Sequence, residues 1–125
     1  MQALQNRAFL SSETSAMDQL QDFLRQRREA HAPAEHLDAV EQELHRLFVA
    51  AEREALRHEL ARFDLDVPVV EVDGERYHQV LRCATTYTSA AGPVRVERGL
   101  YRPSQGGPTL CPLELRAGII EGAWT

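Results

Sequence analysis

The sequence contains no lysine, and all 14 of its basic residues are arginine. The simplest cause is a genome rich in G and C, because arginine codons are rich in these bases and lysine codons are not. Arginine also suits phosphate contacts, since its planar guanidinium donates two hydrogen bonds to one anion. The absence of lysine is therefore compatible with a phosphate-binding protein but does not require one.

Cysteine is scarce, and its two occurrences, Cys83 and Cys111, indicate no disulfide framework. The sequence has no C-x-x-C pair, and its five histidines lie at no zinc-ligand spacing. We expect two reduced thiols. The alternative is a zinc ion held by both cysteines and two distant histidines.

Long apolar runs are also missing. No stretch approaches the roughly 18 residues that cross a bilayer, and Met1–Leu10 has no apolar segment of signal-peptide length. We expect a cytoplasmic protein with no membrane partner.

Enzyme motifs are absent as well: the sequence has no G-x-S-x-G, no phosphate-binding glycine-rich loop and no H-E-x-x-H. We therefore predict no catalytic residue, no metal site, no cofactor and no small-molecule substrate in this chain.

Charge is unevenly distributed along the chain, whose net charge is −5. Residues 1–66 contain 8 Arg and 13 Asp or Glu, and residues 67–125 contain 6 of each kind, so the whole deficit lies in the first half. This distribution excludes a uniformly basic nucleic-acid-binding protein. It is compatible with a local basic face within residues 67–125.

The first half predicts two helices. One begins near Ser15 and is broken at His31-Ala32-Pro33. The second starts at Pro33 and extends to about Phe63, with an apolar stripe at helical spacing formed by Leu37, Val40, Leu44, Leu47 and Ala51.

At about 45 Å, the second predicted helix is longer than a compact domain of this size. We expect the stripe to form either an antiparallel contact with the first helix or a self-association surface through Leu37, Val40, Leu44 and Leu47. The acidic residues of this helix are interpreted as a solvated face, with Glu54 pairing with Arg57.

The second half predicts strands. A valine-rich strand precedes Asp73-Gly74, which is a strong signal for a two-residue hairpin. Even spacing places Tyr77, Leu81, Cys83, Thr85 and Tyr87 on one face of a long strand, and Arg76, His78, Val80 and Arg82 on the other. A turn at Ala91-Gly92-Pro93 precedes a third strand from Val94 to Arg102. Pro112 opens a last helix that carries Leu113, Leu115, Ile119 and Ile120.

The predicted fold class is α+β: an N-terminal helical hairpin with one long helix, a three-stranded antiparallel meander and a short C-terminal helix. We expect two regions, 1–66 and 67–125. The chain ends abruptly after Trp124 and Thr125, which suggests a truncated sequence.

The candidate binding residues are four arginines of the predicted sheet, namely Arg82, Arg95, Arg98 and Arg102, with His78 beside them. Arg98 and Arg102 share a face, Arg82 extends their row on the neighbouring strand, and Arg95 points the opposite way. Such a stripe would contact phosphates. The alternative is cross-strand pairing of these arginines with Glu71, Glu75 and Glu97.

Residues 67–125 resemble the N-terminal region of insertion-sequence transposases of the ISKra type. The resemblance rests on three blocks in matching order and spacing: Val72–Tyr77 with Val80–Cys83 and Thr86–Thr88, then Ala91–Arg98 with Leu100–Arg102, then Leu110–Arg116 with Gly118–Gly122 and Trp124-Thr125. Gly99 departs from the family, which has Thr or a similar residue there. Residues 1–66 fit only as a variable amphipathic prelude.

The resemblance implies a segment that acts in DNA transposition. The wider group cuts and joins DNA with an acidic triad and two divalent metal ions, in a ribonuclease-H-like domain that follows this region, and nothing in this chain corresponds to that triad. DNA at the ends of the element is the implied partner, and we expect a homo-oligomer. The alternatives are a non-catalytic dimerisation module and the remnant of a decayed transposase gene.

Overall fold

The computed structural model describes residues 14–31 and 36–119. The chain falls into two compact units, Met1–Glu54 and Ala55–Thr125. The division between the units lies within the long helix, whereas the sequence suggested a boundary near residue 66, where helix changes to strand.

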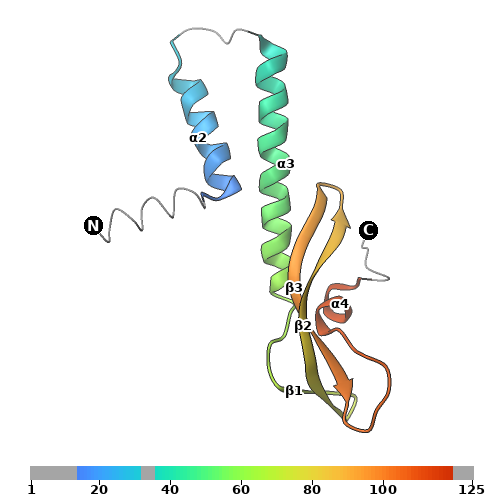
Figure 1. Cartoon of the computed structure of the whole chain (residues 1–125). Helices are drawn as coiled ribbons and strands as arrows, with labels where there is room; N and C mark the ends of the chain where they lie inside the picture. The colour runs from blue at the N-terminus through green and yellow to red at the C-terminus, as the bar shows by residue number, and fades with distance from the viewer. Residues whose placement is uncertain (1–13, 32–35, 120–125) are drawn as a thin grey trace, which may run out of the picture. The chain divides into compact units, whose positions relative to one another are not determined.

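The first unit begins with helix α2, Ala16–Glu29 (Figure 1). The Ser15 hydroxyl accepts a hydrogen bond from the Asp18 backbone N–H at 3.0 Å, which satisfies one of the donors that a helix start leaves unpaired. The predicted helix start is thus confirmed. The helix ends at Glu29, slightly before the break predicted at His31.

Helix α3, Leu37–Ala61, is continuous over 25 residues. It is shorter than predicted: the proposed start at Pro33 lies outside the described residues, and the helix ends before Phe63. The backbone N–H groups of Arg62, Phe63 and Asp64 each bond to the carbonyl three residues earlier. This tighter turn ends the α-helical pattern, as is common at helix termini.

The helices of the first unit pack together around Leu20, Leu47 and Ala51, with Leu44 against this core. The helical hairpin is therefore confirmed, and it uses part of the apolar stripe internally. The predicted Glu54–Arg57 pair is wrong. The Glu54 carboxylate instead accepts hydrogen bonds from the backbone N–H groups of Ala16 and Met17, at 2.9 and 3.3 Å. It is drawn there by the positive end of the α2 dipole.

The second unit contains a three-stranded antiparallel sheet with the order β1-β2-β3 (Figure 1). The strands are β1, Val69–Val72; β2, Glu75–Ser89; and β3, Gly92–Pro103. Between β1 and β2, Asp73 and Gly74 both have positive φ, 51° and 79°. Two consecutive residues of this kind form the turn whose twist matches a two-residue hairpin, so the predicted hairpin is confirmed.

A register shift interrupts the pairing of β2 with β3 between Gln79 and Leu81. Beyond the shift, Leu81, Cys83, Thr85 and Tyr87 share a face, as predicted. Tyr77 pairs with Pro103 and therefore lies on the opposite face, so its predicted position is wrong. The extra residue of a bulge reverses the alternation of side chains along the strand. Val80 and Leu81 are both about half exposed at this point, 50% and 54%.

The core of the second unit lies on the face that carries Tyr87, Val94 and Val96, where Leu60 and Leu113 cover it. Helix α4, Pro112–Ala117, begins at a proline as predicted and ends at Gly118, whose φ of 77° terminates the helix. Ile119 therefore packs in the core from outside the helix, and the predicted helical position of Ile120 lies outside the described residues. None of the described helices is both long and apolar enough to span a membrane.

Candidate functional site

The four candidate arginines do not form one row. The register places Arg98 opposite Cys83 and Arg102 opposite His78, on one face of β3. Arg82 lies opposite Gly99, and Arg95 lies opposite Thr86, on the other face. The prediction that Arg82 extends the Arg98–Arg102 row is therefore wrong, because the register set by the β2–β3 turn pairs even-numbered residues of β2 with odd-numbered residues of β3 from Ser89 to Leu81.

Arg98 lies in a partly buried polar cluster with Tyr87 and Glu114. Its Nη1 donates to the Tyr87 hydroxyl at 3.0 Å and forms an ion pair with the Glu114 carboxylate. The Tyr87 hydroxyl also donates to the same carboxylate at 2.7 Å. The side chains of Arg98 and Glu114 are only 20% and 26% exposed, so Arg98 is engaged within the fold.

The surroundings of this cluster suppress its chemical reactivity. Burial, and then the hydrogen bond to Glu114, raise the pKa of Tyr87 well above its usual range. Burial also raises the pKa of the Cys111 thiol, whose Sγ lies 4.0 Å from Arg98 Nη1. Both groups stay protonated near neutral pH, so neither is prepared to act as a nucleophile.

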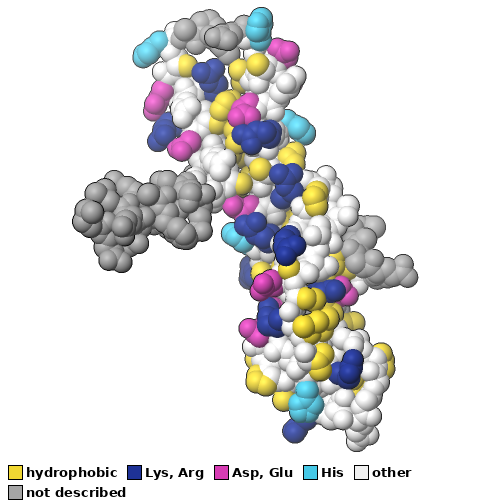
Figure 2. Space-filling model, viewed as in Figure 1, with side chains coloured by type: hydrophobic (Ala, Val, Ile, Leu, Met, Phe, Trp, Pro, Cys, Tyr) yellow, Lys and Arg dark blue, Asp and Glu magenta, His cyan; other side chains and the backbone are white. Residues whose placement is uncertain are grey.

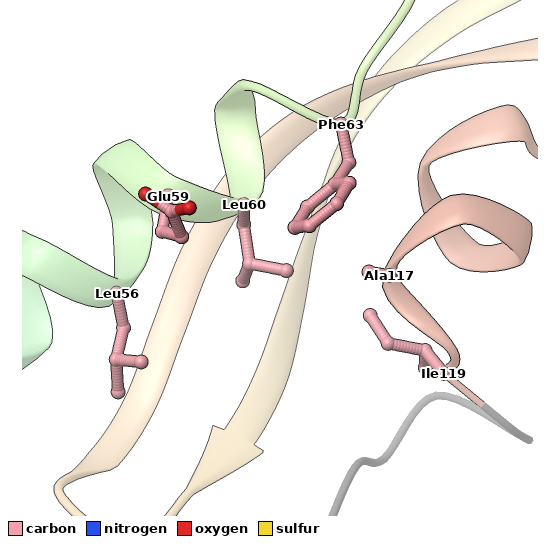
Figure 3. Close-up of a pocket in the computed structure, with 6 residues that line it drawn as sticks. All are labelled: Leu56, Glu59, Leu60, Phe63, Ala117 and Ile119. Carbon is pink, nitrogen blue, oxygen red and sulfur yellow. The ribbon is translucent and has the colours of Figure 1, made fainter.

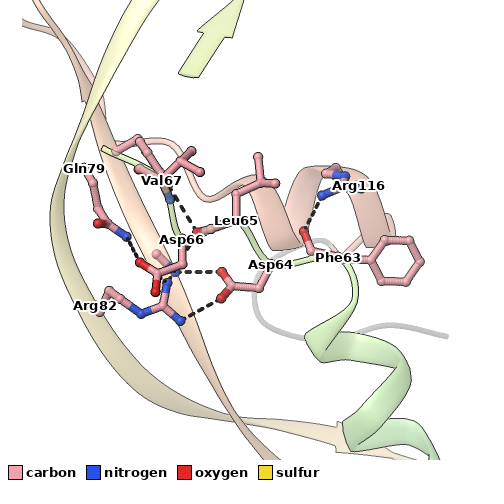
Figure 4. Close-up of polar contacts among 10 residues, drawn as sticks. Phe63, Asp64, Leu65, Asp66, Val67, Gln79, Arg82 and Arg116 are labelled. Carbon is pink, nitrogen blue, oxygen red and sulfur yellow. Dashed lines mark hydrogen bonds and ion pairs between the residues drawn. The ribbon is translucent and has the colours of Figure 1, made fainter. Parts of the chain in front are cut away.

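Arg82 is bound by the segment that follows α3 (Figure 4). Its guanidinium contacts Asp64 Oδ2 at 2.7 Å, Asp66 Oδ1 at 3.4 Å and the Leu65 carbonyl oxygen at 3.3 Å. The hydrogen bond that Arg82 donates to Asp64 is the largest effect that raises the pKa of Arg82, although burial opposes it. Internal pairing thus engages Arg82 and Arg98, but through Asp64, Asp66 and Glu114 rather than through the cross-strand Glu71, Glu75 and Glu97.

The same segment is also held against β3. The second carboxylate oxygen of Asp64, Oδ1, accepts a hydrogen bond from the Gly99 backbone N–H at 3.0 Å. The buried Tyr101 hydroxyl lies 2.7 Å from the Val67 carbonyl oxygen and accepts from the Val67 N–H at 3.2 Å. Gln79 contacts Asp66, and Arg116 of α4 donates to the Phe63 carbonyl at 3.0 Å (Figure 4). Residues 63–67 are therefore fixed from both the sheet and α4.

Arg102 belongs to an exposed group that we call the hairpin-end surface, made of Arg76, His78 and Arg102. The register places Arg102 opposite His78, and Arg76 lies two residues from His78 on the same face of β2. Neither arginine forms an ion pair with any residue in 14–31 or 36–119. Glu71 lies opposite Arg76, however, and offsets part of its charge.

Arg95 belongs to a second group, which we call the basic groove. It is a surface hollow of about 430 Å³, lined by Arg57, His58 and Ala61 of α3 and by Ala84, Arg95, Val96 and Glu97 of the sheet. Figure 2 shows several arginine side chains and a histidine gathered over the lower half of α3. The sequence interpretation missed Arg57 and His58. No local signal identifies them, because the groove arises where the end of a helix meets two strands.

An apolar hollow of about 160 Å³ lies elsewhere in this unit (Figure 3). Leu56, Leu60, Phe63, Ala117 and Ile119 line it, and Glu59 is its one polar lining residue. A single carboxylate, paired with Arg62 outside the lining, gives this hollow no catalytic arrangement.

Metal-ligating side chains do not converge in residues 14–31 and 36–119, where no group of three His, Cys, Asp or Glu could hold an ion. Cys83 and Cys111 are both free thiols. The alternative of a shared zinc ion therefore gains no support from the described part of the chain.

The predicted self-association residues have different environments. Leu47 is 3% exposed and Leu44 packs against it within the hairpin, whereas Leu37 is 80% exposed. Val40 is intermediate. The apolar stripe therefore serves the hairpin at Leu44 and Leu47, and only its N-terminal end is open to solvent.

Comparison with known protein families, curated proteins and solved structures finds no match to this chain. Functional inference therefore rests on its own residues, together with the resemblance of residues 67–125 described above.

Proposed function

We propose that this chain is a cytoplasmic, non-catalytic segment of an insertion-sequence transposase that contacts DNA. The observation that carries the proposal is a set of exposed arginines on an acidic chain, none with an acidic partner among residues 14–31 and 36–119: Arg57, Arg76, Arg95 and Arg102. All four belong to the unit Ala55–Thr125, whose strands carry most of the resemblance to the transposases.

Exposed guanidinium groups favour contacts with the phosphate backbone over base-specific recognition. Phosphate contacts position a protein on DNA and carry no sequence information of their own. The net charge of −5 opposes the approach of DNA as a whole. Binding should therefore be local, weak and sensitive to salt.

We expect the wild-type chain to bind a duplex of the element's terminal repeat with a Kd of about 10⁻⁴ to 10⁻⁶ M, the range of non-specific binding. Fluorescence anisotropy at several salt concentrations measures this affinity. Each phosphate contact contributes a slope of about −0.9 to the plot of log K against log salt, so four arginines limit the slope to about −4. Absence of binding at 50 mM salt, or binding that salt leaves unchanged, would contradict the proposal.

A second candidate function, self-association, is favoured by two exposed apolar side chains on α3. Leu37 and Phe48 are 80% and 51% exposed. They lie close to three helical turns apart and so occupy the same side of the helix. A second copy of the chain that packs there would remove this apolar surface from water.

We expect Phe48→Glu to convert a concentration-dependent dimer into a monomer, because it places a charge in the apolar contact. Sedimentation velocity over a range of concentrations measures this, with Gln42→Glu at an exposed site of the same helix as the control. Leu44→Glu is unsuitable because Leu44 packs in the hairpin core. A wild-type chain that is monomeric at high concentration would eliminate this candidate.

A further inference from the structure

We propose that the basic groove binds the phosphate backbone of DNA and is the principal contact site of this chain. The inference rests on the proposed function and names the site within it. Arg57 and Arg95 bind the phosphate oxygens, and His58 adds an imidazole N–H donor.

The two arginines of the groove come from different elements. Arg57 and His58 are consecutive residues of α3, and Arg95 lies on β3. Both arginines line the same hollow, and neither pairs with an acid of the described chain. An anion that enters between these two unpaired cations is attracted by both of them, and this attraction is stronger than that of either cation alone.

Small and apolar residues form the rest of the lining. Ala61, Ala84 and Val96 present short side chains, and Val96 is 6% exposed. Short side chains let a phosphodiester approach closely. The apolar surroundings also strengthen each charge-assisted hydrogen bond relative to one made in open water.

Local charge distinguishes the groove from the hairpin-end surface. The groove lining has two arginines and one acid, Glu97, so its formal charge is +1 with His58 neutral. At the hairpin end, the two arginines share the β1–β2 hairpin with Glu71, Asp73 and Glu75, so the formal charge there is −1 with His78 neutral. An approaching phosphate is therefore attracted more strongly to the groove than to the hairpin end.

The experiment compares two double variants that remove equal charge, Arg57→Gln/Arg95→Gln in the groove and Arg76→Gln/Arg102→Gln at the hairpin end. Fluorescence anisotropy of a labelled duplex of about 25 base pairs is measured from 50 to 200 mM salt. Far-UV circular dichroism and thermal melting establish that both variants are folded. Arg62→Gln is a further control, since Arg62 directly follows the same helix but pairs with Glu59.

We expect the groove variant to weaken binding at least about tenfold, because two charge-assisted contacts are lost. Its salt slope should flatten by about one to two units, at ~0.9 per phosphate contact. The hairpin-end variant and Arg62→Gln should weaken binding less than threefold. Equal losses in the two double variants, or a loss confined to the hairpin-end variant, would overturn the assignment.

Titration with inorganic pyrophosphate distinguishes failure of this inference from failure of the proposed function. The arginine Nε–H signals are followed by NMR. Pyrophosphate shifts at Arg57 and Arg95 in a chain that binds no duplex would overturn the DNA proposal and assign the groove to a small phosphate anion. Duplex binding that leaves both signals unmoved would retain the proposed function and overturn the groove.

Discussion

Glu114→Leu is expected to destabilise the unit Ala55–Thr125 by about 2 to 4 kcal/mol, because it leaves the Arg98 charge partly buried without its counterion. The range is below that for a fully buried pair because both side chains keep some exposure, 20% for Arg98 and 26% for Glu114. The Tyr87 hydroxyl also loses its acceptor. Since Glu114 lies on α4 and Arg98 on β3, this cluster attaches the last helix to the sheet.

Urea denaturation followed by near-UV circular dichroism of tyrosine measures the loss, since all three tyrosines of the chain belong to this unit. The control is Leu115→Ala, at a side chain of the same helix that is 60% exposed, which should change stability by less than about 0.5 kcal/mol. The double variant Arg98→Met/Glu114→Leu should be more stable than Glu114→Leu alone, because it removes the unpaired charge. A loss in the double variant equal to the sum of the losses in Glu114→Leu and Arg98→Met would show that the pair is not coupled.

Local signals in the sequence were sufficient to predict the elements of this fold. Ser15 marks the start of α2 through its own hydroxyl, Asp73-Gly74 determines the hairpin through its backbone preference, and Pro112 opens α4. Each of these features depends on residues within a few positions of one another. The order of two helices, three strands and a short helix follows from them.

The arrangement of the candidate site depends on contacts between residues far apart in the chain, and the sequence does not encode these locally. The bulge at Gln79–Leu81 reversed the expected face of Tyr77, and the register of the β2–β3 turn placed Arg82 on the face opposite to Arg98 and Arg102. Even-numbered spacing predicts faces only while the pairing register is unbroken. A bulge without a glycine at the site leaves no sequence signal that would warn of this.

The ion-pair partners of the arginines could not be predicted from local sequence either. Arg82 pairs with Asp64, 18 residues earlier, and Arg98 pairs with Glu114, 16 residues later. Cross-strand acids were the natural sequence-based partners, but the acids that bind these arginines come from the segments that flank the sheet. Arg57 was expected to pair with Glu54, and it became a candidate only because that carboxylate binds the start of α2. The basic groove therefore emerges only from the assembled structure.

Gly99→Ala is expected to destabilise the same unit by about 2 to 3 kcal/mol, although it replaces the weakest strand former. A Cβ at this position would lie 2.8 Å from the Leu65 carbonyl oxygen and 2.9 Å from Gln79 Nε2. Removing a glycine restricts the unfolded chain, which favours the variant by about 0.4 to 1 kcal/mol. Displacing residues 64–67 costs more, about 1 to 3 kcal/mol for overpacking. Weakening the Gly99–Asp64 hydrogen bond costs about 1 kcal/mol in addition. The steric effect therefore exceeds the entropic gain.

Near-UV circular dichroism in urea again measures the change, and Glu97→Ala at an exposed site two residues away serves as the control. Gly99→Ala/Gln79→Ala separates the two neighbours of the added Cβ, because it removes the flexible amide but leaves the backbone oxygen of Leu65 in place. We expect this double variant to recover little of the loss. The Leu65 carbonyl is fixed through the backbone that Asp64, Tyr101 and Arg82 hold against the sheet. Full recovery would show that only the Gln79 side chain opposes the Cβ and that residues 64–67 yield to it. Equal stabilities of Gly99→Ala and the Glu97→Ala control would show that the close approach of this segment to β3 contributes nothing to the stability of the unit.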